Sequence, residues 1–207
     1  MRKAAKQFRI WTVVGCNHRL TAPNRPQNSL YIVSDEGEVV NRYDKRWCSN
    51  SEITDWYSPG DLPCVFEVDG FKFGCALCIE IQFPVLFSEY EALDVDCVLF
   101  STYSEDPMFW TQAQGHAATN NYWLSFSVPA QCSANLQSGM INPDGNGQSR
   151  AQMSAEDQML IAQLDYEDPG LQVALTKARP WRRKARSGEI YQDKPKNDPR
   201  SLDKLSY

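Results

Sequence analysis

The chain has 207 residues, of which 42% are hydrophobic and 23% charged, and its formal net charge at pH 7 is −5. These values exclude a disordered or fibrous chain and are typical of one globular domain with a sizeable core. No apolar run is long enough to span a membrane, and residues 1–10 lack the apolar stretch of an export signal. Seven irregularly spaced cysteines on such a chain favour free thiols. We therefore expect a cytoplasmic protein without a membrane partner.

Charge is distributed unevenly along the chain. Residues 177–207 hold ten Lys/Arg and four Asp/Glu, a net charge of +6, whereas the preceding residues carry −11. This change predicts a domain over residues 1–176 and a basic C-terminal arm over 177–207. A basic arm suits nucleic acid or an acidic neighbouring subunit. The acidic body argues against nucleic acid, so we favour a solvated or subunit-bridging arm.

Local patterns in the first part of the chain predict a helix followed by strands in hairpins. In order, they are a helix over 2–8, a buried strand over 10–14 closed by Gly15, strands over 29–34 and 38–43, a loop over 44–62, and strands over 65–68 and from 71 onward. The last two strands flank Asp69-Gly70, and this pair fits a type I′ turn because both central residues need positive φ.

The stretch that follows this turn carries the first chemical signal. Residues 75–79 are continuously apolar and predict a strand buried on both faces, while Pro84 suits the first turn of a helix over 85–93. Cys78 thus stands at a strand-to-helix turn, where α/β proteins display nucleophiles. A buried structural thiol is the alternative. Cys75 and Cys78 share the spacing of redox and zinc motifs, but no second such pair exists and we expect no metal.

The second part of the chain alternates strands with helices. The predicted elements are a strand over 95–100, a helix over 107–122, strands over 123–128 and 159–164, a helix over 171–177, and a polar extended arm over 192–207. Alternation of this kind favours parallel strands joined by crossover helices, and hence an α/β fold. The chain has no Gly-rich phosphate loop, so we expect no cofactor.

Three motifs follow one another in a specific order. They are Tyr43-x-Lys45, then Glu52 ahead of an aromatic-x-Pro59-Gly60, then Gly74-x3-Cys78-x-Glu80-x2-Phe83-Pro84. In this order and spacing they resemble the nitrilase superfamily of carbon–nitrogen hydrolases. Further similar segments extend the resemblance over about residues 1–165, at Asn28-Ser29, Asp96 to Ser101, Trp110 to Asn120 and Asn142 to Gly145.

The resemblance implies an α-β-β-α four-layer sandwich and a Glu-Lys-Cys triad. Cys78 would be the nucleophile, Lys45 would stabilise the thiolate and the oxyanion, and Glu52 would position the lysine. The backbone N–H of Ile79 would be a second oxyanion donor. The implied activity is hydrolysis of a linear amide or N-carbamoyl compound through a thioester on Cys78, in a homo-oligomer without cofactor or metal.

The sequence also departs from the family pattern. Gln82, Val85, His116 and Thr119 replace residues common in the family, which we expect to alter salt bridges around the site more than the reaction. The family's general-base glutamate lies on an earlier strand than residues 2–14, so we expect no such base in this chain. Since Met1 opens within a predicted helix, we expect a false start or a shortened chain. The alternative function is a catalytically inactive fragment or interaction module.

Two other functions are compatible with single features of the sequence. A Cys-His hydrolase would need His18, expected in an exposed loop, or His116, expected on a helix to cap a surface contact. A nucleic-acid binder would use the basic residues 179–186. Neither accounts for the ordered motifs around Cys78, and both are therefore secondary hypotheses.

Overall fold

The computed structural model of the chain describes residues 1–194 and 198–205. The strands are β1 (Thr12–His18), β2 (Gln27–Val33), β3 (Val39–Asp44), β4 (Val65–Val68), β5 (Phe71–Leu77), β6 (Cys97–Ser101), β7 (Trp123–Ser127), β8 (Gly139–Ile141) and β9 (Gly147–Arg150). The helices are α1 (Arg2–Phe8), α2 (Pro84–Ala92), α3 (Met108–Asn120), α4 (Arg179–Arg186) and α5 (Pro199–Leu202). None of the helices in these described ranges has the length and apolar character needed to cross a bilayer.

A three-stranded antiparallel sheet forms the first layer, in the order β1-β2-β3. The turn between β2 and β3 contains Gly37 at φ 77°. A Cβ there would lie 2.5 Å from the carbonyl oxygen of Arg2, whose side-chain Nε donates to the Gly37 carbonyl at 2.8 Å. Glycine thus permits both the turn and the close approach of α1, and the predicted hairpin is confirmed.

A six-stranded sheet in the order β4 to β9 forms the second layer. Strands β4 and β5 make the predicted hairpin, and Asp69 and Gly70 both have positive φ as a type I′ turn requires. Strands β5, β6 and β7 are parallel and are connected through α2 and α3, which confirms the expected crossovers. Cys78 directly follows β5, the strand that pairs with β4 in the hairpin and with β6 in the parallel part of the sheet.

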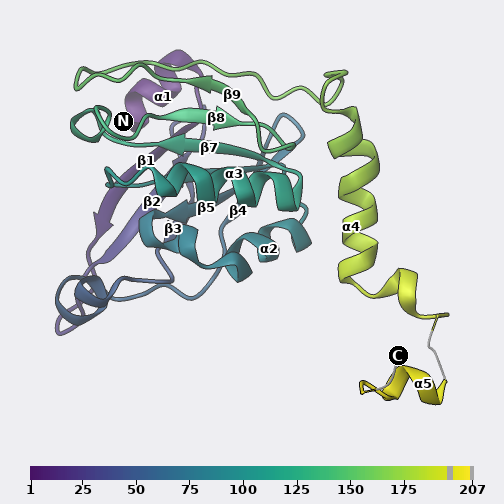
Figure 1. The fold of residues 1–207 in the computed structure, drawn as a ribbon. Coiled ribbons are helices and arrows are strands. Elements are labelled where there is room, and N and C mark those ends of the chain that lie inside the picture. Colours follow the sequence, from purple (N-terminus) through teal and green to yellow (C-terminus); the bar gives the residue numbers. More distant parts are fainter. Residues whose placement is uncertain (195–197, 206–207) are drawn as a thin grey trace.

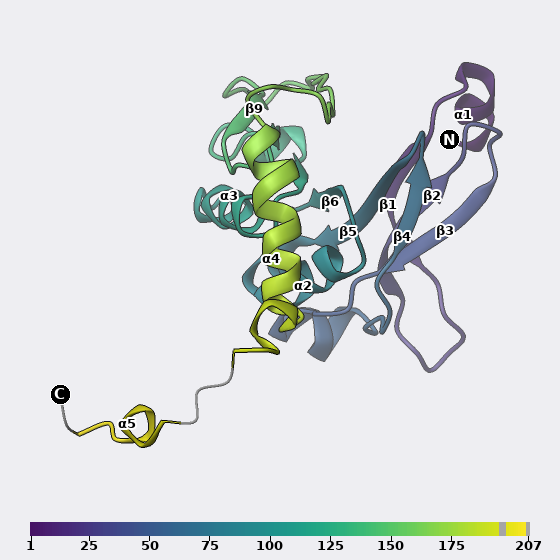
Figure 2. The ribbon, with the colours of Figure 1, turned by 90° about the vertical axis from the view of Figure 1, so that its right-hand side faces the viewer.

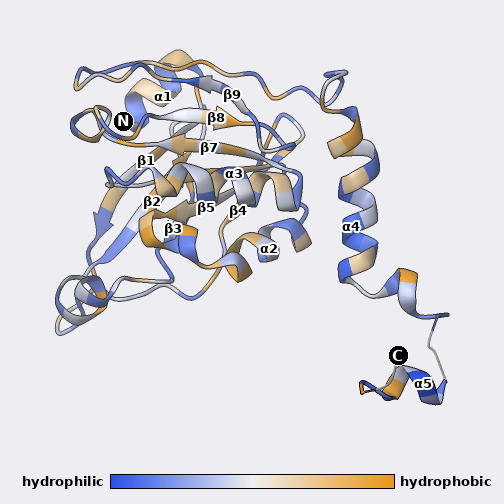
Figure 3. Cartoon of the chain, viewed as in Figure 1, coloured by the Kyte–Doolittle hydropathy of each residue, from blue (hydrophilic) through white to orange (hydrophobic). Residues whose placement is uncertain are grey.

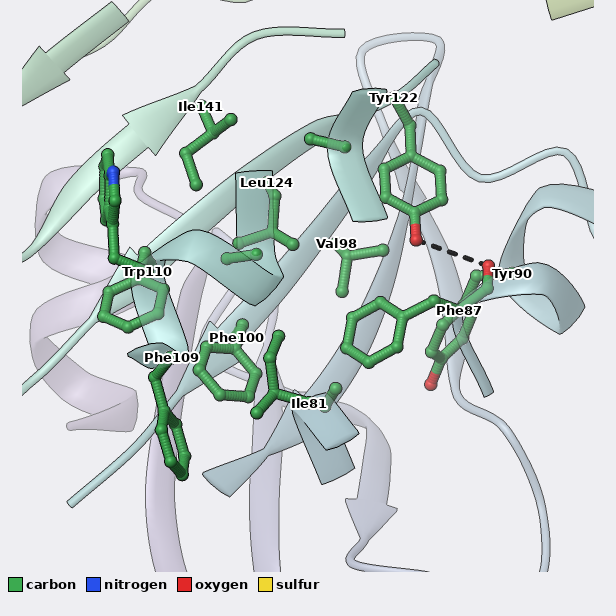
Figure 4. Close-up of a cluster of buried hydrophobic side chains, with 14 of the residues drawn as sticks. Ile81, Phe87, Tyr90, Val98, Phe100, Phe109, Trp110, Tyr122, Leu124 and Ile141 are labelled. Atoms are coloured by element: carbon green, nitrogen blue, oxygen red, sulfur yellow. Dashed lines mark hydrogen bonds between the residues drawn. The ribbon is translucent and has the colours of Figure 1, made fainter. Parts of the chain in front are cut away.

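Helices α2 and α3 cover one face of the six-stranded sheet. The largest cluster of buried side chains lies between these helices and the sheet (Figure 4). Phe87 and Trp110 pack from the helices onto Phe100 and Leu124 of the sheet. The buried Tyr122 hydroxyl donates to the Phe87 carbonyl at 3.3 Å. This apolar layer fixes α2 against the sheet and therefore fixes the turn that precedes it.

The opposite face of β5 packs against the three-stranded sheet, so the two sheets lie face to face (Figure 2). Cys75 and Leu77 of β5 contact a cluster with Leu30, Ile32 and Tyr43. The resulting order of layers, helices outside a pair of sheets, confirms the expected α/β sandwich architecture. Since β3 and β5 meet in this interface, the segments that follow each of them emerge close together.

The basic C-terminal segment packs on the body of the same chain. A π-helical turn, η4 (Val173–Ala178), leads into α4, which stands at one side of the molecule in Figure 1 and is mostly hydrophilic in Figure 3. The guanidinium group of Arg179 donates to Asp96 at 2.8 Å, and that of Arg186 lies 2.8 Å from the Glu91 carboxylate. Up to residue 186, the segment expected to be a solvated or subunit-bridging arm is a helix docked on the body of the same chain. The extended arm expected over 192–207 contains the short helix α5, and its residues 195–197 and 206–207 lie outside the described residues.

Several expectations for individual elements are wrong. The strand β1 does not close at Gly15 but continues to His18, and it is half-exposed rather than buried. A Cβ at Gly15 would make only an ordinary contact, so nothing local stops the strand there. The strand expected over 159–164 is absent. That segment keeps alternating exposure, with Ala162 and Leu164 packed on the core, but it joins no sheet.

Candidate active site

The loop after β3 holds Lys45 by its backbone on both sides. The Lys45 N–H donates to the Asn28 carbonyl and its own carbonyl accepts from the Gly60 N–H, each at 2.8 Å. A Cβ at Gly60 would lie 2.4 Å from the Asp44 carbonyl oxygen, so this close approach requires glycine. The Pro59-Gly60 part of the motif therefore has a structural function, which is to pin the lysine segment.

The side chains of Lys45 and Glu52 form a buried ion pair. The lysine Nζ lies 2.6 and 2.5 Å from the two carboxylate oxygens, and the lysine is fully buried while Glu52 is 9% exposed. Glu52 begins a π-helical turn, η1 (Glu52–Trp56), and also accepts the Ser49 N–H at 2.7 Å. Burial acts to raise the pKa of Glu52, but the hydrogen bonds from Lys45 and Ser49 outweigh it, and the net pKa is lowered.

Cys78 occupies a strained turn directly after β5. Its φ of 53° lies in the left-handed region, which costs a non-glycine residue about 1–3 kcal/mol and persists only where its surroundings impose it. The residue is half-buried and contacts the core beneath α2 and α3. A thiol in such a conformation between a parallel strand and a helix matches the arrangement in which α/β proteins present a nucleophile.

A cleft of about 670 Å³ opens at the carboxyl ends of the parallel strands. Cys78, Ile79 and Glu52 all line it, so three of the four predicted site residues share one space. Lys45 is not among the lining residues and reaches this region through its pair with Glu52. The remaining walls combine aromatic rings with hydroxyl groups, from Trp56, Tyr57, Tyr103, Ser101, Thr102 and Ser127.

The carboxylate of Glu80 lies buried between the two segments of the site. It accepts the Leu77 N–H at 2.7 Å, the Arg46 N–H at 2.8 Å and the Trp47 N–H at 3.0 Å, and the Tyr43 hydroxyl donates to it at 2.8 Å. Burial raises the pKa of Glu80, and these hydrogen bonds partly oppose the rise. The sequence placed Glu80 near the site but gave no sign of these long-range partners.

Both histidines lie outside the lining of the cleft. His18 ends β1 instead of lying in an exposed loop, and its ring nitrogens are 2.6 Å from the Tyr31 hydroxyl and 2.8 Å from the Arg42 guanidinium. His116 stacks on Phe87 and donates from Nε2 to the Ile81 carbonyl at 2.8 Å; burial lowers its pKa. A Cys-His pair at Cys78 therefore has no support. Within the described ranges, no three His, Cys, Asp or Glu side chains form a metal-binding group.

Three of the four positions at which the sequence departs from the family pattern lie together, away from the cleft. Gln82, His116 and Thr119 line a cavity of about 280 Å³ at α2 and α3, whereas Val85 is exposed. None of the four lines the cleft beside Cys78.

The fold and the cleft define an α/β protein of paired sheets with a thiol displayed at the end of a parallel strand. The chain belongs to the carbon–nitrogen hydrolase family, whose model matches residues 1–170.

Two curated proteins and two solved structures illustrate the similarity. Nitrilase homolog 2 of Dictyostelium discoideum is 25% identical over 144 residues, covering 63% of this chain and 44% of that protein. The deaminated glutathione amidase of Yersinia enterocolitica is 22% identical over 143 residues, covering 64% and 48%. This chain therefore spans less than half the length of either relative.

The solved structures show the shared fold. Saccharomyces cerevisiae Nit3, a member of branch 10 of the nitrilase superfamily, has a TM-score of 0.66 at 18% identity, with 75% of this chain and 60% of that one covered. A mutant amidase from Nesterenkonia sp. AN1, with the acetamide moiety of fluoroacetamide covalently added at its active-site cysteine, has a TM-score of 0.65 at 17% identity, covering 74% and 61%.

Proposed function

We propose that this chain carries the thiol centre of an amide hydrolase, with Cys78 as the nucleophile. The observation that carries the proposal is the meeting, in one cleft, of a cysteine on a strained turn with the carboxylate of a buried Lys45–Glu52 pair. In this assignment Lys45 stabilises negative charge, Glu52 positions it, and the Ile79 N–H is a second donor.

The proposed reaction divides into acylation and deacylation. The Cys78 sulfur attacks the amide carbonyl carbon and the negative charge moves to the carbonyl oxygen, where a hydrogen bond from the Ile79 N–H and the positive charge of Lys45 stabilise it. The C–N bond then breaks with the thiol proton delivered to the leaving amine, which leaves a thioester. Water cleaves the thioester, giving the carboxylic acid and restoring the thiol.

The proton transfers of both steps need a general base. The family resemblance assigns this role to a glutamate other than Glu52 and Glu80, and Glu52 is already engaged by Lys45 and Ser49. Acylation of Cys78 and the subsequent hydrolysis of the thioester therefore have to be measured separately for this chain. A catalytically inactive module of the same fold is the second candidate, because the Glu52 carboxylate that shares the cleft with Cys78 is already engaged by Lys45 and Ser49.

The proposed substrate is a linear amide or an N-carbamoyl compound. A cleft walled by Trp56, Tyr57 and Tyr103, with hydroxyls from Ser101 and Thr102, suits a small acyl group with a few polar contacts. The names of the Yersinia and Nesterenkonia relatives, both amidases, support amides over nitriles. A homo-oligomer and a cytoplasmic location remain predictions.

Intact-protein mass spectrometry tests the proposal. The chain is incubated with short aliphatic amides, and the acyl adduct and the released ammonia are both measured, with Cys78→Ser as the control. An adduct on Cys78 together with ammonia above the control supports the hydrolase. An adduct without continuing ammonia release indicates a centre that acylates but does not turn over. Neither adduct nor ammonia, with Cys78 unreactive toward iodoacetamide, favours the inactive module.

A further inference from the structure

Glu80 connects the two parts of the chain on which the proposed chemistry depends. Its carboxylate accepts the N–H of Leu77, the residue immediately before Cys78, at 2.7 Å. It also accepts the N–H of Arg46, the residue immediately after Lys45, at 2.8 Å. One side chain thus hydrogen-bonds to the backbone of the residue before Cys78 and of the residue after Lys45, which lie more than thirty positions apart in the sequence.

The same carboxylate closes a short loop that contains the strained residue Cys78. Leu77 caps the short 3₁₀ turn η2 (Cys78–Gln82), and the Glu80 side chain returns to the backbone N–H of this capping residue. This is the glutamate half of a capping box, since the leucine side chain has no acceptor atom, and it ties the entry of the turn to Glu80. Cys78, with its φ of 53°, lies inside this closed loop but makes no part of the hydrogen bond that closes it.

Only a carboxylate fits this set of donors. Glu80 is fully buried, and four donors converge on its two oxygens, namely the N–H groups of Leu77, Arg46 and Trp47 and the hydroxyl of Tyr43. An ionised carboxylate is purely an acceptor with room for about four hydrogen bonds, whereas a glutamine has one acceptor oxygen and two N–H donors. A glutamine would therefore face at least one backbone N–H with another donor.

We propose that Glu80 is a positioning residue, which holds the Cys78 turn and the Lys45 segment in the relative geometry that makes the thiol reactive. Glu80 is not a lining residue of the cleft, and it acts through its backbone partners. The inference rests on the proposed function of Cys78. It adds to the Lys45–Glu52 pair a second buried carboxylate with a different task, since Glu52 orients a charge and Glu80 orients two segments.

The test is the rate at which iodoacetamide alkylates Cys78, measured by peptide mass spectrometry from pH 5.5 to 8.5. Glu80→Gln is compared with Glu91→Gln, which alters another buried carboxylate, one that pairs with Arg186 on α4. Misplacement of reacting groups by about 1 Å can cost about 10²-fold in rate, so we expect a ten- to hundredfold slower reaction in Glu80→Gln. We expect Glu91→Gln to lose stability but keep the wild-type rate and pH profile.

The outcomes separate this inference from the function on which it rests. If Cys78 of the unmodified chain reacts no faster than the other six thiols, the proposed function fails and this inference with it. If Cys78 is fast and remains equally fast in Glu80→Gln, Glu80 is only structural. Should Glu80→Gln not fold, Glu80→Asp keeps the charge but draws the carboxylate back by one methylene from the Leu77 and Arg46 N–H groups. A slower Cys78 in that variant supports positioning, and an unchanged rate refutes it.

Discussion

Replacing Glu52 by glutamine measures the free energy of unfolding that is lost when the buried ion pair is broken. The glutamine oxygen can still accept the Ser49 N–H, but Lys45 keeps its charge in a fully buried position without an anionic partner. Removal of one partner from a buried pair costs about 3–5 kcal/mol, and because the Glu52 side chain is 11% exposed we expect the lower value, about 3 kcal/mol. For a chain of this size the midpoint of thermal unfolding falls by about 6–12 °C.

Urea unfolding followed by circular dichroism measures this free energy. The matched control is Glu36→Gln, which breaks an exposed pair with Arg9 and is expected to change stability by less than about 1 kcal/mol. Adding Lys45→Met to Glu52→Gln removes the stranded charge and should recover most of the loss. A cost for Glu52→Gln no greater than that of Glu36→Gln would refute the reasoning, because Lys45 would then be solvated without its partner.

The same variant has a pH signature with a definite sign. The folded-state pKa of Glu52 lies below its ordinary value of 4.5, because the hydrogen bonds from Lys45 and Ser49 outweigh burial. A carboxylate whose pKa is lower in the folded than in the unfolded state stabilises the fold. This stabilisation is complete at pH values above the unfolded pKa and is lost as the pH falls through the folded pKa. Below about pH 5 the stability of the unmodified chain should therefore fall more steeply than that of Glu52→Gln.

Three further substitutions test the supports of the site. Gly60→Ala forces the backbone away from the Lys45 segment and should slow Cys78 alkylation, whereas Gly115→Ala, with open space around its Cβ, should not. Phe87→Ala removes a fully buried ring from the core under α2 and should cost about 3–5 kcal/mol in urea unfolding, against little for the exposed Val85→Ala. Arg179→Ala should speed amide hydrogen exchange throughout α4, and unchanged exchange would show that the remaining contacts, such as Arg186 with Glu91, suffice to hold the helix.

The elements that the sequence predicted well are those set by short-range chemistry. The Asp69-Gly70 turn follows from two residues that tolerate positive φ, and the strand before Cys78 follows from a continuous apolar run. The expected strand over 159–164 shows the limit of such patterns. Alternating apolar residues do give an extended segment with two distinct faces, but they cannot indicate whether a neighbouring strand is free to pair with it.

The residues of the candidate site could be proposed from the sequence, but their connections could not. Order and spacing of motifs selected Cys78, Lys45 and Glu52 as candidates; Cys78 and Glu52 line one cleft, and Lys45 pairs with Glu52. A lysine after a strand is ordinarily solvated, and its complete burial became visible only with the fold. The bonds of Glu80 to Tyr43 and Arg46 depend on the packing of two sheets, for which no local pattern carries a signal.

The ion pairs that dock α4 on the body of the chain differ in their expected sensitivity to ionic strength. The Arg179–Asp96 pair is almost enclosed, with side-chain exposures of 10% and 9%, whereas the side chains of Arg183 and Asp94 are 43% and 49% exposed. Salt weakens exposed pairs far more than enclosed ones, since the screening length at 0.1 M is about 10 Å in water. Rising salt should therefore weaken the Arg183–Asp94 pair before the Arg179–Asp96 pair, while the turn at Arg179 stays anchored.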